Sequence, residues 1–177
     1  MAEPPKFRYH PNPVATGSVE KCDDACGQCG LARGYIYVGP VYCEQEPTDA
    51  ICPWCIADGS AAEALNAEFS DPRALAQEKL DPKIIDSVTK RTPGYTTWQG
   101  EEWEACCEDA CAFLGDAKQE DLKSLAADER QRLMDRMGLD DEELVGIVEN
   151  YQVGGSPAFY KFKCLHCGKL RFAWDCD

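Results

Sequence analysis

The chain has 177 residues, and its 32 acidic side chains outnumber its 18 basic ones, which gives a formal net charge of −14. This length suits one compact domain or two small ones, and it is long enough to bury a hydrophobic core. The acidity disfavours nucleic acids and anionic membranes as partners, because both attract lysine and arginine, and no apolar run approaches the roughly 20 residues that span a bilayer.

The first residues of the chain, Met1 to Lys21, are polar and are punctuated by prolines at positions 4, 5, 11 and 13. Proline fixes the backbone in an extended conformation, so this segment predicts an extended arm. It lacks the apolar stretch of a signal peptide. We therefore expect a cytoplasmic protein whose thiols are reduced.

The next segments predict one strand and two helices. Tyr35 to Val38 is β-branched and aromatic and is followed by Gly39-Pro40, which is typical of a strand. Ser60 with Glu63 fits a capping box that opens a helix to about Phe69. Asp81 before Pro82 fits the N-cap and first position of another helix.

The second half of the chain is predicted mainly from its apolar periodicity and its cap residues. In chain order, it predicts a helix over 101–106, a short strand at 113–114, helices over 116–137 and 140–151, and strands over 158–164 and 170–174. A cysteine turn joins the last two strands.

Twelve cysteines are the most informative feature of the sequence. In a reducing compartment their expected use is metal binding. Cys26 and Cys29 form one C-x-x-C turn, and Cys52 and Cys55 form a second, with the predicted strand between them. Two such turns predict a closed, tetrahedral four-thiolate site, and soft sulfur ligands select zinc or iron over hard cations.

The segment Cys52-Pro53-Trp54-Cys55 also fits a thioredoxin-type redox pair, which lies at the N-terminus of a helix in a βαβ unit. The predicted helix begins only at Ser60, and a matching C-x-x-C turn lies upstream. The sequence therefore favours a metal site over a redox pair here.

A third C-x-x-C turn, from Cys164 to Cys167, needs partners from Cys106, Cys107 and Cys111. On a helix, Cys107 and Cys111 share a face because they are four residues apart, whereas Cys106 points sideways. The sequence therefore predicts a second zinc site with the ligands Cys107, Cys111, Cys164 and Cys167.

The remaining candidate ligands have no assigned role. His166 lies inside the third turn, and we interpret it as a bystander. The roles of Cys22, Cys43, Cys106 and Cys176 stay open. Neither four-cysteine set leaves an open coordination position, and His10 and His166 are the only histidines. We therefore assign no catalytic residues; the sequence leans against an enzyme and leaves that question open.

Together these patterns predict an α+β protein with zinc-ribbon-like cysteine turns, short β-hairpins, a helical segment and two structural zinc sites. Residues 1–70 are expected to form the arm and a first zinc-ribbon-like unit. Residues 71–177 are expected to form the helical segment, which a second zinc site and a C-terminal hairpin close.

Several motifs resemble the CbrC family of bacterial proteins, most of which have no known function. The resemblance rests on F-x-Y-H-P-x-P at 7–13, G-Y-I-Y-x-G-P at 34–40, C-P-W-C-I-A-D-G-S-A-A at 52–62, R-T-P-G-Y at 91–95, W-Q at 98–99, Trp103 and C-L-H-C-G at 164–168. It implies the same eight cysteines as ligands: Cys26, Cys29, Cys52, Cys55, Cys107, Cys111, Cys164 and Cys167. One family member is linked to tolerance of E-type colicins, which implies a protective role.

The acidic charge is concentrated in residues 101–149, where 16 acids and 5 bases give 5 − 16 = −11. Such a run is either a solvated helical face or a docking surface for a basic protein. Nuclease toxins are basic because they bind nucleic acid, and complementary charge speeds association. We hypothesise that segment 101–149 meets a basic protein partner.

The leading hypothesis is therefore a cytoplasmic two-zinc protein that acts through protein–protein interaction, with colicin tolerance or immunity as the implied role. One alternative is a nucleic-acid-binding zinc ribbon, for which Lys161, Lys163, Lys169 and Arg171 form the local basic group. A less favoured alternative is a thiol-redox enzyme that uses Cys52 and Cys55.

Overall fold

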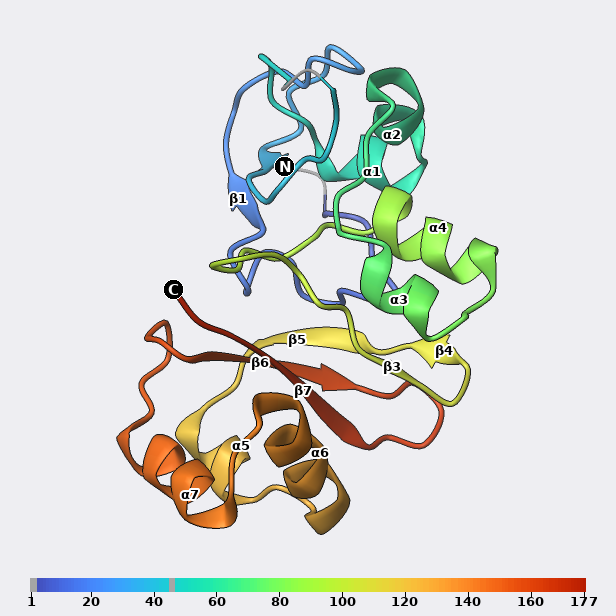
Figure 1. Cartoon of the computed structure of the whole chain (residues 1–177). Coiled ribbons are helices and arrows are strands. Elements are labelled where there is room, and N and C mark those ends of the chain that lie inside the picture. Colours follow the sequence, from blue (N-terminus) through green and yellow to red (C-terminus); the bar gives the residue numbers. More distant parts are fainter. Residues whose placement is uncertain (1–2, 45–46) are drawn as a thin grey trace.

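The computed structural model describes residues 3–44 and 47–177, so the first two residues of the predicted arm lie outside it. The N-terminal half contains a two-stranded hairpin and four short helices (Figure 1). These elements are β1 (Val19–Lys21), β2 (Tyr35–Tyr37), α1 (Pro53–Ala57), α2 (Ser60–Leu65), α3 (Arg73–Gln77) and α4 (Pro82–Arg91).

The C-terminal half is built on an antiparallel sheet of order β5-β6-β7, preceded by the small β3–β4 hairpin. Three helices lie between β5 and β6 in the chain. The elements are β3 (Ala105–Cys106), β4 (Asp109–Ala110), β5 (Ala112–Asp116), α5 (Gln119–Lys123), α6 (Ala127–Met137), α7 (Asp141–Asn150), β6 (Ala158–Lys163) and β7 (Leu170–Asp175). The fold is therefore the predicted α+β mixture of short antiparallel hairpins and helices.

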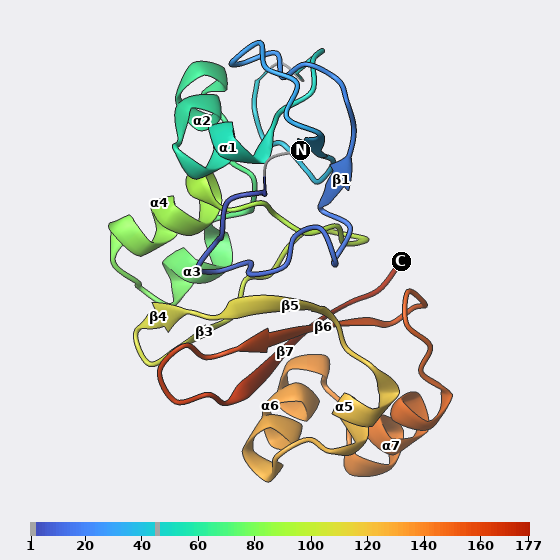
Figure 2. The same ribbon diagram turned by 180° about the vertical axis from the view of Figure 1, so that it is seen from behind.

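The three-stranded sheet is the middle layer of the molecule, because both of its faces are covered (Figure 2). Tyr160 and Phe162 of β6 pack with Tyr95 and Trp103 in one hydrophobic cluster. Phe159, which points to the other face, packs in a second cluster that α5, α6 and α7 supply. The alternation follows from the two-residue period of a strand.

The N-terminal arm is fixed to the C-terminal sheet. The backbone N–H of Phe113 on β5 donates to the carbonyl of Tyr9 at 2.8 Å. The fully buried His10 ring lies edge-on to Phe113, with ring centroids 4.9 Å apart. Its Nδ1 donates to the carbonyl of Pro93 at 2.7 Å, since a carbonyl can only accept, and Nε2 faces the Thr16 hydroxyl at 2.6 Å.

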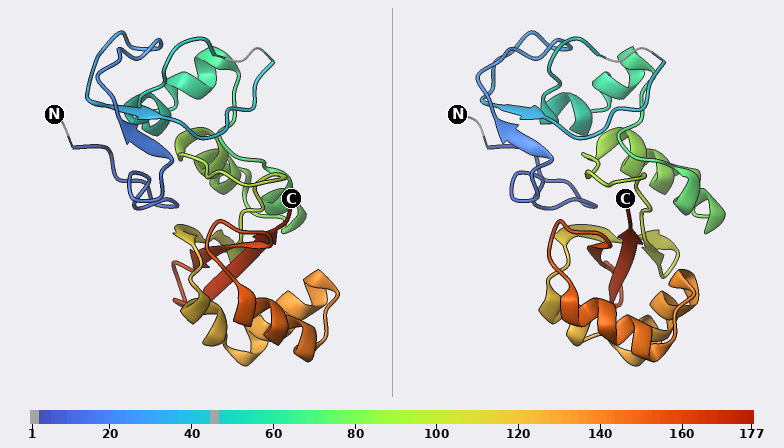
Figure 3. Two further views of the ribbon diagram at one scale, coloured as in Figure 1. Left: turned by 90° about the vertical axis from the view of Figure 1, so that its left-hand side faces the viewer. Right: turned by 60° about the vertical axis from the view of Figure 1, so that its left-hand side comes forward.

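One of the hydrophobic clusters contains side chains from both halves of the chain. A single cluster of buried side chains contains Tyr9 of the arm, Leu75 of α3, Val88 of α4 and Phe162 of β6. The C-terminus lies between the two halves in both views of Figure 3. The proposed division at residue 70 stays a prediction.

Most predicted elements are present with small changes of boundary. Asp81 caps α4 by accepting from the Lys83 N–H at 2.8 Å, and Asp140 and Glu143 form the expected capping box of α7. Gly138 ends α6 in the left-handed conformation. The predicted helix from Ser60 is shorter than expected, because Asn66 adopts a positive φ of 46°.

The single helix predicted over 116–137 is two helices, α5 and α6. Ser124 lies at the break, and its hydroxyl donates to the carbonyl of Glu120 at 2.8 Å. Such local bonds compete with helix continuation. Leu122 of α5 and Leu133 of α6 both lie in the cluster under the sheet.

The helix predicted over 101–106 is wrong, since this segment is extended and ends in β3. Its backbone and side chains form hydrogen bonds with the chain at Cys111, where the next strand begins. The carbonyl of Glu104 accepts from the Cys111 N–H at 2.8 Å, and the Trp103 indole N–H donates to the Cys111 carbonyl at 2.8 Å. These pairings require an extended backbone.

Replacement of Leu144 by alanine tests the helical layer. Leu144 is fully buried, whereas Val145, the next residue of α7, is 37% exposed. We expect Leu144→Ala to lower the free energy of unfolding by roughly 2–5 kcal/mol, and Val145→Ala to change it by less than about 0.5 kcal/mol. Urea denaturation measures both, and equal effects would show that α7 does not pack on the sheet.

His10 makes the arm sensitive to acid. Burial lowers the pKa of His10 from 6.5 to about 4, although the Pro93 carbonyl opposes this. The unfolded chain therefore binds more protons between these values, and the free energy of unfolding falls as the pH drops from 6.5 to 4. The loss is about 3 kcal/mol. Denaturation at several pH values should show a smaller loss for His10→Gln, and an unchanged slope would contradict this.

Candidate metal centres

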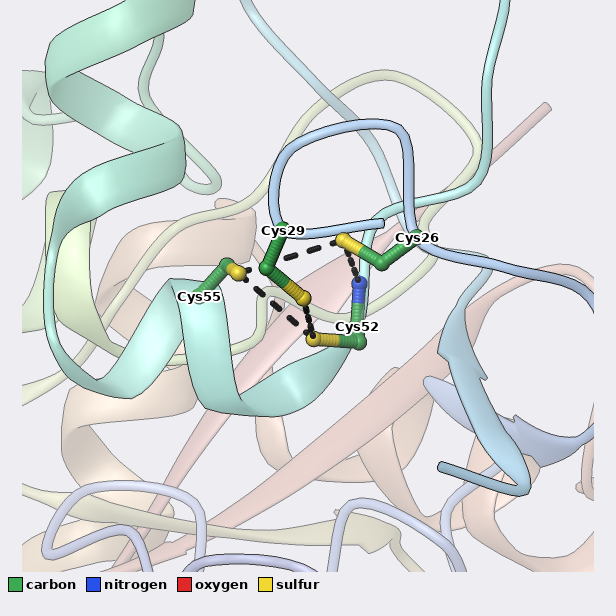
Figure 4. A group of neighbouring side chains, drawn as sticks. All are labelled: Cys26, Cys29, Cys52 and Cys55. Atoms are coloured by element: carbon green, nitrogen blue, oxygen red, sulfur yellow. Dashed lines mark hydrogen bonds between the residues drawn. The ribbon is translucent and has the colours of Figure 1, made fainter. Parts of the chain in front are cut away.

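The first four-cysteine group joins the β1–β2 loop to α1. Cys26 and Cys29 lie in the loop, and Cys52 and Cys55 lie at the start of the helix (Figure 4). Their sulfur atoms point toward one another and all lie within 4.8 Å. The measured separations are 3.9 Å for Cys26–Cys55, 3.8 Å for Cys29–Cys52 and 3.6 Å for Cys52–Cys55.

Backbone bonds bring the two sulfur pairs together. The Tyr37 N–H of β2 donates to the Ile51 carbonyl at 2.7 Å, and the Gly27 N–H donates to the Ala50 carbonyl at 2.8 Å. Gly27 must be glycine here, because a Cβ would lie 2.4 Å from Cβ of Asp49. The chain before Cys52 is thus held against the Cys26 turn.

The sulfur separations fit a four-thiolate zinc or iron site. Four sulfurs at about 2.3 Å from one ion form a tetrahedron with edges of about 3.8 Å. The three separations at the first group lie within 0.2 Å of that edge. The group contains only sulfur donors, which is the donor set of a closed structural site.

The surroundings of Cys26 favour its thiolate form. Burial raises the pKa of this thiol, but N–H groups of Cys52, Cys29 and Gln28 outweigh burial and lower the pKa to about 7. The Cys52 N–H lies 3.3 Å from the Cys26 sulfur. By contrast, burial raises the pKa of Cys55. A bound cation would supply the attraction that ionises the remaining thiols.

The expected tight turn at residues 52–55 is a helix start. α1 begins at Pro53 with Cys52 as its N-cap, so a helix starts at this turn as well as at Ser60, contrary to the prediction. A βαβ unit is nevertheless missing in the described residues, where every sheet is antiparallel. Cys26 and Cys29 also lie against the same two sulfurs, which favours metal over a redox pair.

The second group joins two hairpin turns and contains Cys106, Cys107, Cys164 and Cys167. The sulfur of Cys106 lies 3.7 Å from that of Cys107 and 3.8 Å from that of Cys167. All four sulfurs lie within 4.8 Å of one another. The geometry matches that of the first group.

The β3–β4 turn places Cys106 and Cys107 side by side. Cys106 pairs with Asp109 across the hairpin, which leaves Cys107 and Glu108 as a two-residue loop. Both have positive φ, 55° and 59°, as a type I′ turn requires. Glycine or asparagine usually signals this turn, and neither is present at 107–108, so local sequence signals do not indicate it.

The structure does not bring Cys111 to this group. Cys111 is fully buried in the core with Trp103 and Phe113, at the start of the sheet. Its selection rested on a helical spacing with Cys107, and the segment is a hairpin instead. In a tight turn, adjacent cysteines can both reach one site, which is why Cys106 takes the place that Cys111 was expected to fill.

Backbone and side-chain donors also surround the second group. The N–H groups of His166 and Cys167 each lie 3.5 Å from the Cys164 sulfur. Burial raises the pKa of Cys164, but these donors outweigh it and lower the pKa to about 6. The guanidinium of Arg171 donates through Nη2 to the Cys106 sulfur at 3.8 Å.

Asp109 fixes the second group to the arm. Its buried carboxylate accepts from Arg8 at 2.6 Å, from the Tyr9 hydroxyl at 2.8 Å and from His166 Nε2 at 2.8 Å. Burial raises the pKa of Asp109, but these bonds give a net lowering. His166, interpreted as a bystander, therefore links the two cysteine turns without belonging to the sulfur group.

The two groups differ in exposure. In the first, Cys26, Cys52 and Cys55 are buried, whereas in the second Cys107 and Cys167 are exposed. Four cysteines lie outside both groups: Cys111 is buried, and Cys22, Cys43 and Cys176 are partly buried.

Substitution separates the two candidates for the fourth ligand. We expect Cys106→Ser to lose most of the metal of the second centre, because a hydroxyl is a poor substitute for thiolate. Cys111→Ala should keep both ions and lose only packing energy. Elemental analysis after desalting measures the metal per chain. Loss of an ion from Cys111→Ala and not from Cys106→Ser would contradict the structure.

Comparison with known proteins places the chain in a family. It is 46% identical over 172 residues to a UPF0167 protein of Pseudomonas aeruginosa, covering 97% of this chain and 96% of that protein. It is 39% identical over 166 residues to UPF0167 proteins of Mycobacterium bovis and Mycobacterium tuberculosis, covering 93% of this chain and 89% of those proteins.

No solved structure matches the chain. The family model covers residues 4–176 and is described as an uncharacterised protein family, which leaves the colicin link of the CbrC resemblance a proposal. With a match over nearly its whole length, the chain belongs to the uncharacterised family UPF0167.

Proposed function

We propose that this chain is a zinc-stabilised cytoplasmic protein that acts by binding a basic protein partner through an acidic helical surface. The observation that carries the proposal is the run Asp140–Asn150, which contains five exposed carboxylates and no lysine or arginine. Its formal charge is 0 − 5 = −5, counted over Asp140, Asp141, Glu142, Glu143 and Glu149.

Zinc fits both sulfur groups as a structural ion. Neither group includes a histidine or a carboxylate that would make a catalytic zinc site with an open position. When bound, the ion would supply a cross-link between segments that are distant in the chain. Each centre would then stabilise the scaffold that presents the acidic surface.

The acidic charge of residues 101–149 is not spread evenly over the surface. Glu104 and Glu129 are buried, and they pair with Arg132, Arg136 and Arg171. These pairs lie inside the structure and offer little to a partner. On α7 no lysine or arginine of the same helix offsets the acids, and among the described residues Asp141 is the α7 acid with a recorded ion pair, to Arg130 at 2.7 Å.

The nucleic-acid alternative has little support from the basic group. Lys161 pairs with Asp121 at 2.8 Å, Lys169 with Asp128 at 2.7 Å, and Arg171 with Glu129 at 2.7 Å. Cations already paired with carboxylates release few counterions from a phosphate backbone. The protein-binding proposal needs no rearrangement of these pairs.

A membrane partner is also not part of the proposal. Within the described ranges, no helix is both long and apolar enough to cross a bilayer. Among basic proteins, the CbrC resemblance favours a nuclease toxin domain, and tolerance or immunity would follow if the acidic surface covered the toxin's nucleic-acid site.

Binding to a purified colicin nuclease domain tests the proposal. We expect Kd to weaken as salt rises, because the attraction is electrostatic. The double variant Glu142→Lys/Glu149→Lys on α7 should weaken binding by at least about tenfold, which corresponds to about 1.4 kcal/mol. The matched control, Glu20→Lys/Glu63→Lys, makes the same charge change at exposed residues of the N-terminal half.

Comparing the two double variants separates the effect of the α7 surface from the effect of total net charge. Equal weakening by both double variants would mean that only total charge matters. Binding that neither variant alters would contradict the role of α7. If the toxin does not bind at all, other basic proteins with known sequences would be tested with the same pair of variants.

A further inference from the structure

Arg171 of β7 connects the second sulfur group to the helical layer. Its Nη2 donates to the Cys106 sulfur at 3.8 Å, and its Nη1 donates to Glu129 Oε2 of α6 at 2.7 Å. The side chain is only 18% exposed. The planar guanidinium can serve both acceptors at once because its donors point in fixed directions.

Glu129 is fixed on the other side of this link. Only 3% of its side chain is exposed, and it accepts from Arg132 Nη2 at 2.6 Å and from the Phe172 backbone N–H at 2.9 Å. Arg132 in turn pairs with Glu104 at 3.0 Å. α6, β7 and the β3–β4 hairpin are therefore joined by one buried ionic network that reaches the sulfur of Cys106.

A cation at this position would stabilise the second group if its four thiolates held one divalent ion. Such a centre has a formal charge of 2 − 4 = −2. Hydrogen bonds from outside the ligand set orient the ligands, and their removal typically weakens metal binding by 10- to 100-fold. Arg171 is the cationic side chain recorded in contact with a sulfur of either group within the described residues.

We propose that Arg171 is a positioning residue of the second metal centre, which it stabilises by donating to the Cys106 thiolate while Glu129 holds its guanidinium in place. The inference rests on the proposed metal binding at this group. It adds that the metal and α6 stabilise each other through Arg171.

Lys169 provides a matched control. It is a cation of the same hairpin, two residues before Arg171, and it also pairs with a carboxylate of α6, Asp128 at 2.7 Å. Lys169 is 56% exposed, and its recorded hydrogen bond goes to this carboxylate and not to a sulfur. Lys169→Gln and Arg171→Gln thus make the same charge change within one hairpin, and both remove an ion pair to α6.

The experiment uses the full chain loaded with Co²⁺, whose thiolate charge-transfer absorption reports on the sulfur ligands. Competition with a chelator gives the affinity of each centre, and Cys106→Ser identifies which absorption and affinity belong to the second one. We expect Arg171→Gln to weaken only the second centre, by roughly 10- to 100-fold, and to shift its absorption. Lys169→Gln should leave both centres unchanged.

If Arg171→Gln does not fold, Arg171→Lys is the second test variant. A lysine keeps the charge but lacks the fork that reaches two acceptors, so it should still weaken the second centre selectively. Equal affinities for the Arg171 and Lys169 variants would overturn the inference. So would equal weakening of both centres, which is the result of a general loss of folding stability. A wild-type chain that binds one ion, at the first group only, would overturn the second centre itself and the inference with it.

Discussion

The convergence of four sulfurs at each of two points is the constraint on which the rest of the structure depends. Four thiolates repel one another, and a divalent cation is what makes their close approach favourable. At the second group, Cys106 and Cys167 are 61 positions apart in the chain, so one ion would close a long loop that includes all three C-terminal helices. The first group closes a shorter loop and holds α1 against the β1–β2 hairpin. An ion at each point would add folding free energy to the sheet and helices between them.

The charges of the chain are arranged around this framework in two ways. Some acids are interior: Asp109 joins the arm to the second group, and Glu129 joins α6 to Arg171. Others face outward on α7, where no base of the same helix neutralises them. The net charge of −14 therefore combines structural carboxylates with a local acidic surface. Metal bound at the two sulfur groups would help to position that surface, because the helices are attached to strands that begin or end at the cysteine turns.

Much of this could be predicted from local patterns, and the failures have physical causes. The first sulfur group followed from two C-x-x-C turns, and the α7 capping box followed from Asp140 and Glu143. Three of the four residues predicted for the second site, Cys107, Cys164 and Cys167, lie in the second sulfur group. The difference, Cys111, comes from the helix predicted over 101–106 and the helical spacing of Cys107 and Cys111, whereas the pairing of Trp103 and Glu104 with Cys111 imposes a hairpin. The positive φ of Cys107 belongs to the two-residue turn of the β3–β4 hairpin, and a cysteine side chain does not signal it. No local pattern indicated that Arg171 contacts a sulfur, because that contact joins residues from different hairpins.

Native mass spectrometry of the purified chain, before and after a chelator, tests the central claim most directly. Two centres predict a folded charge envelope at the mass of the chain plus two zinc or iron ions. Removal of the ions should convert that envelope to the higher charge states of an expanded chain, since the sulfur groups then lose their cross-links. One ion or none in the folded protein, or a compact envelope that persists without metal, would contradict the account.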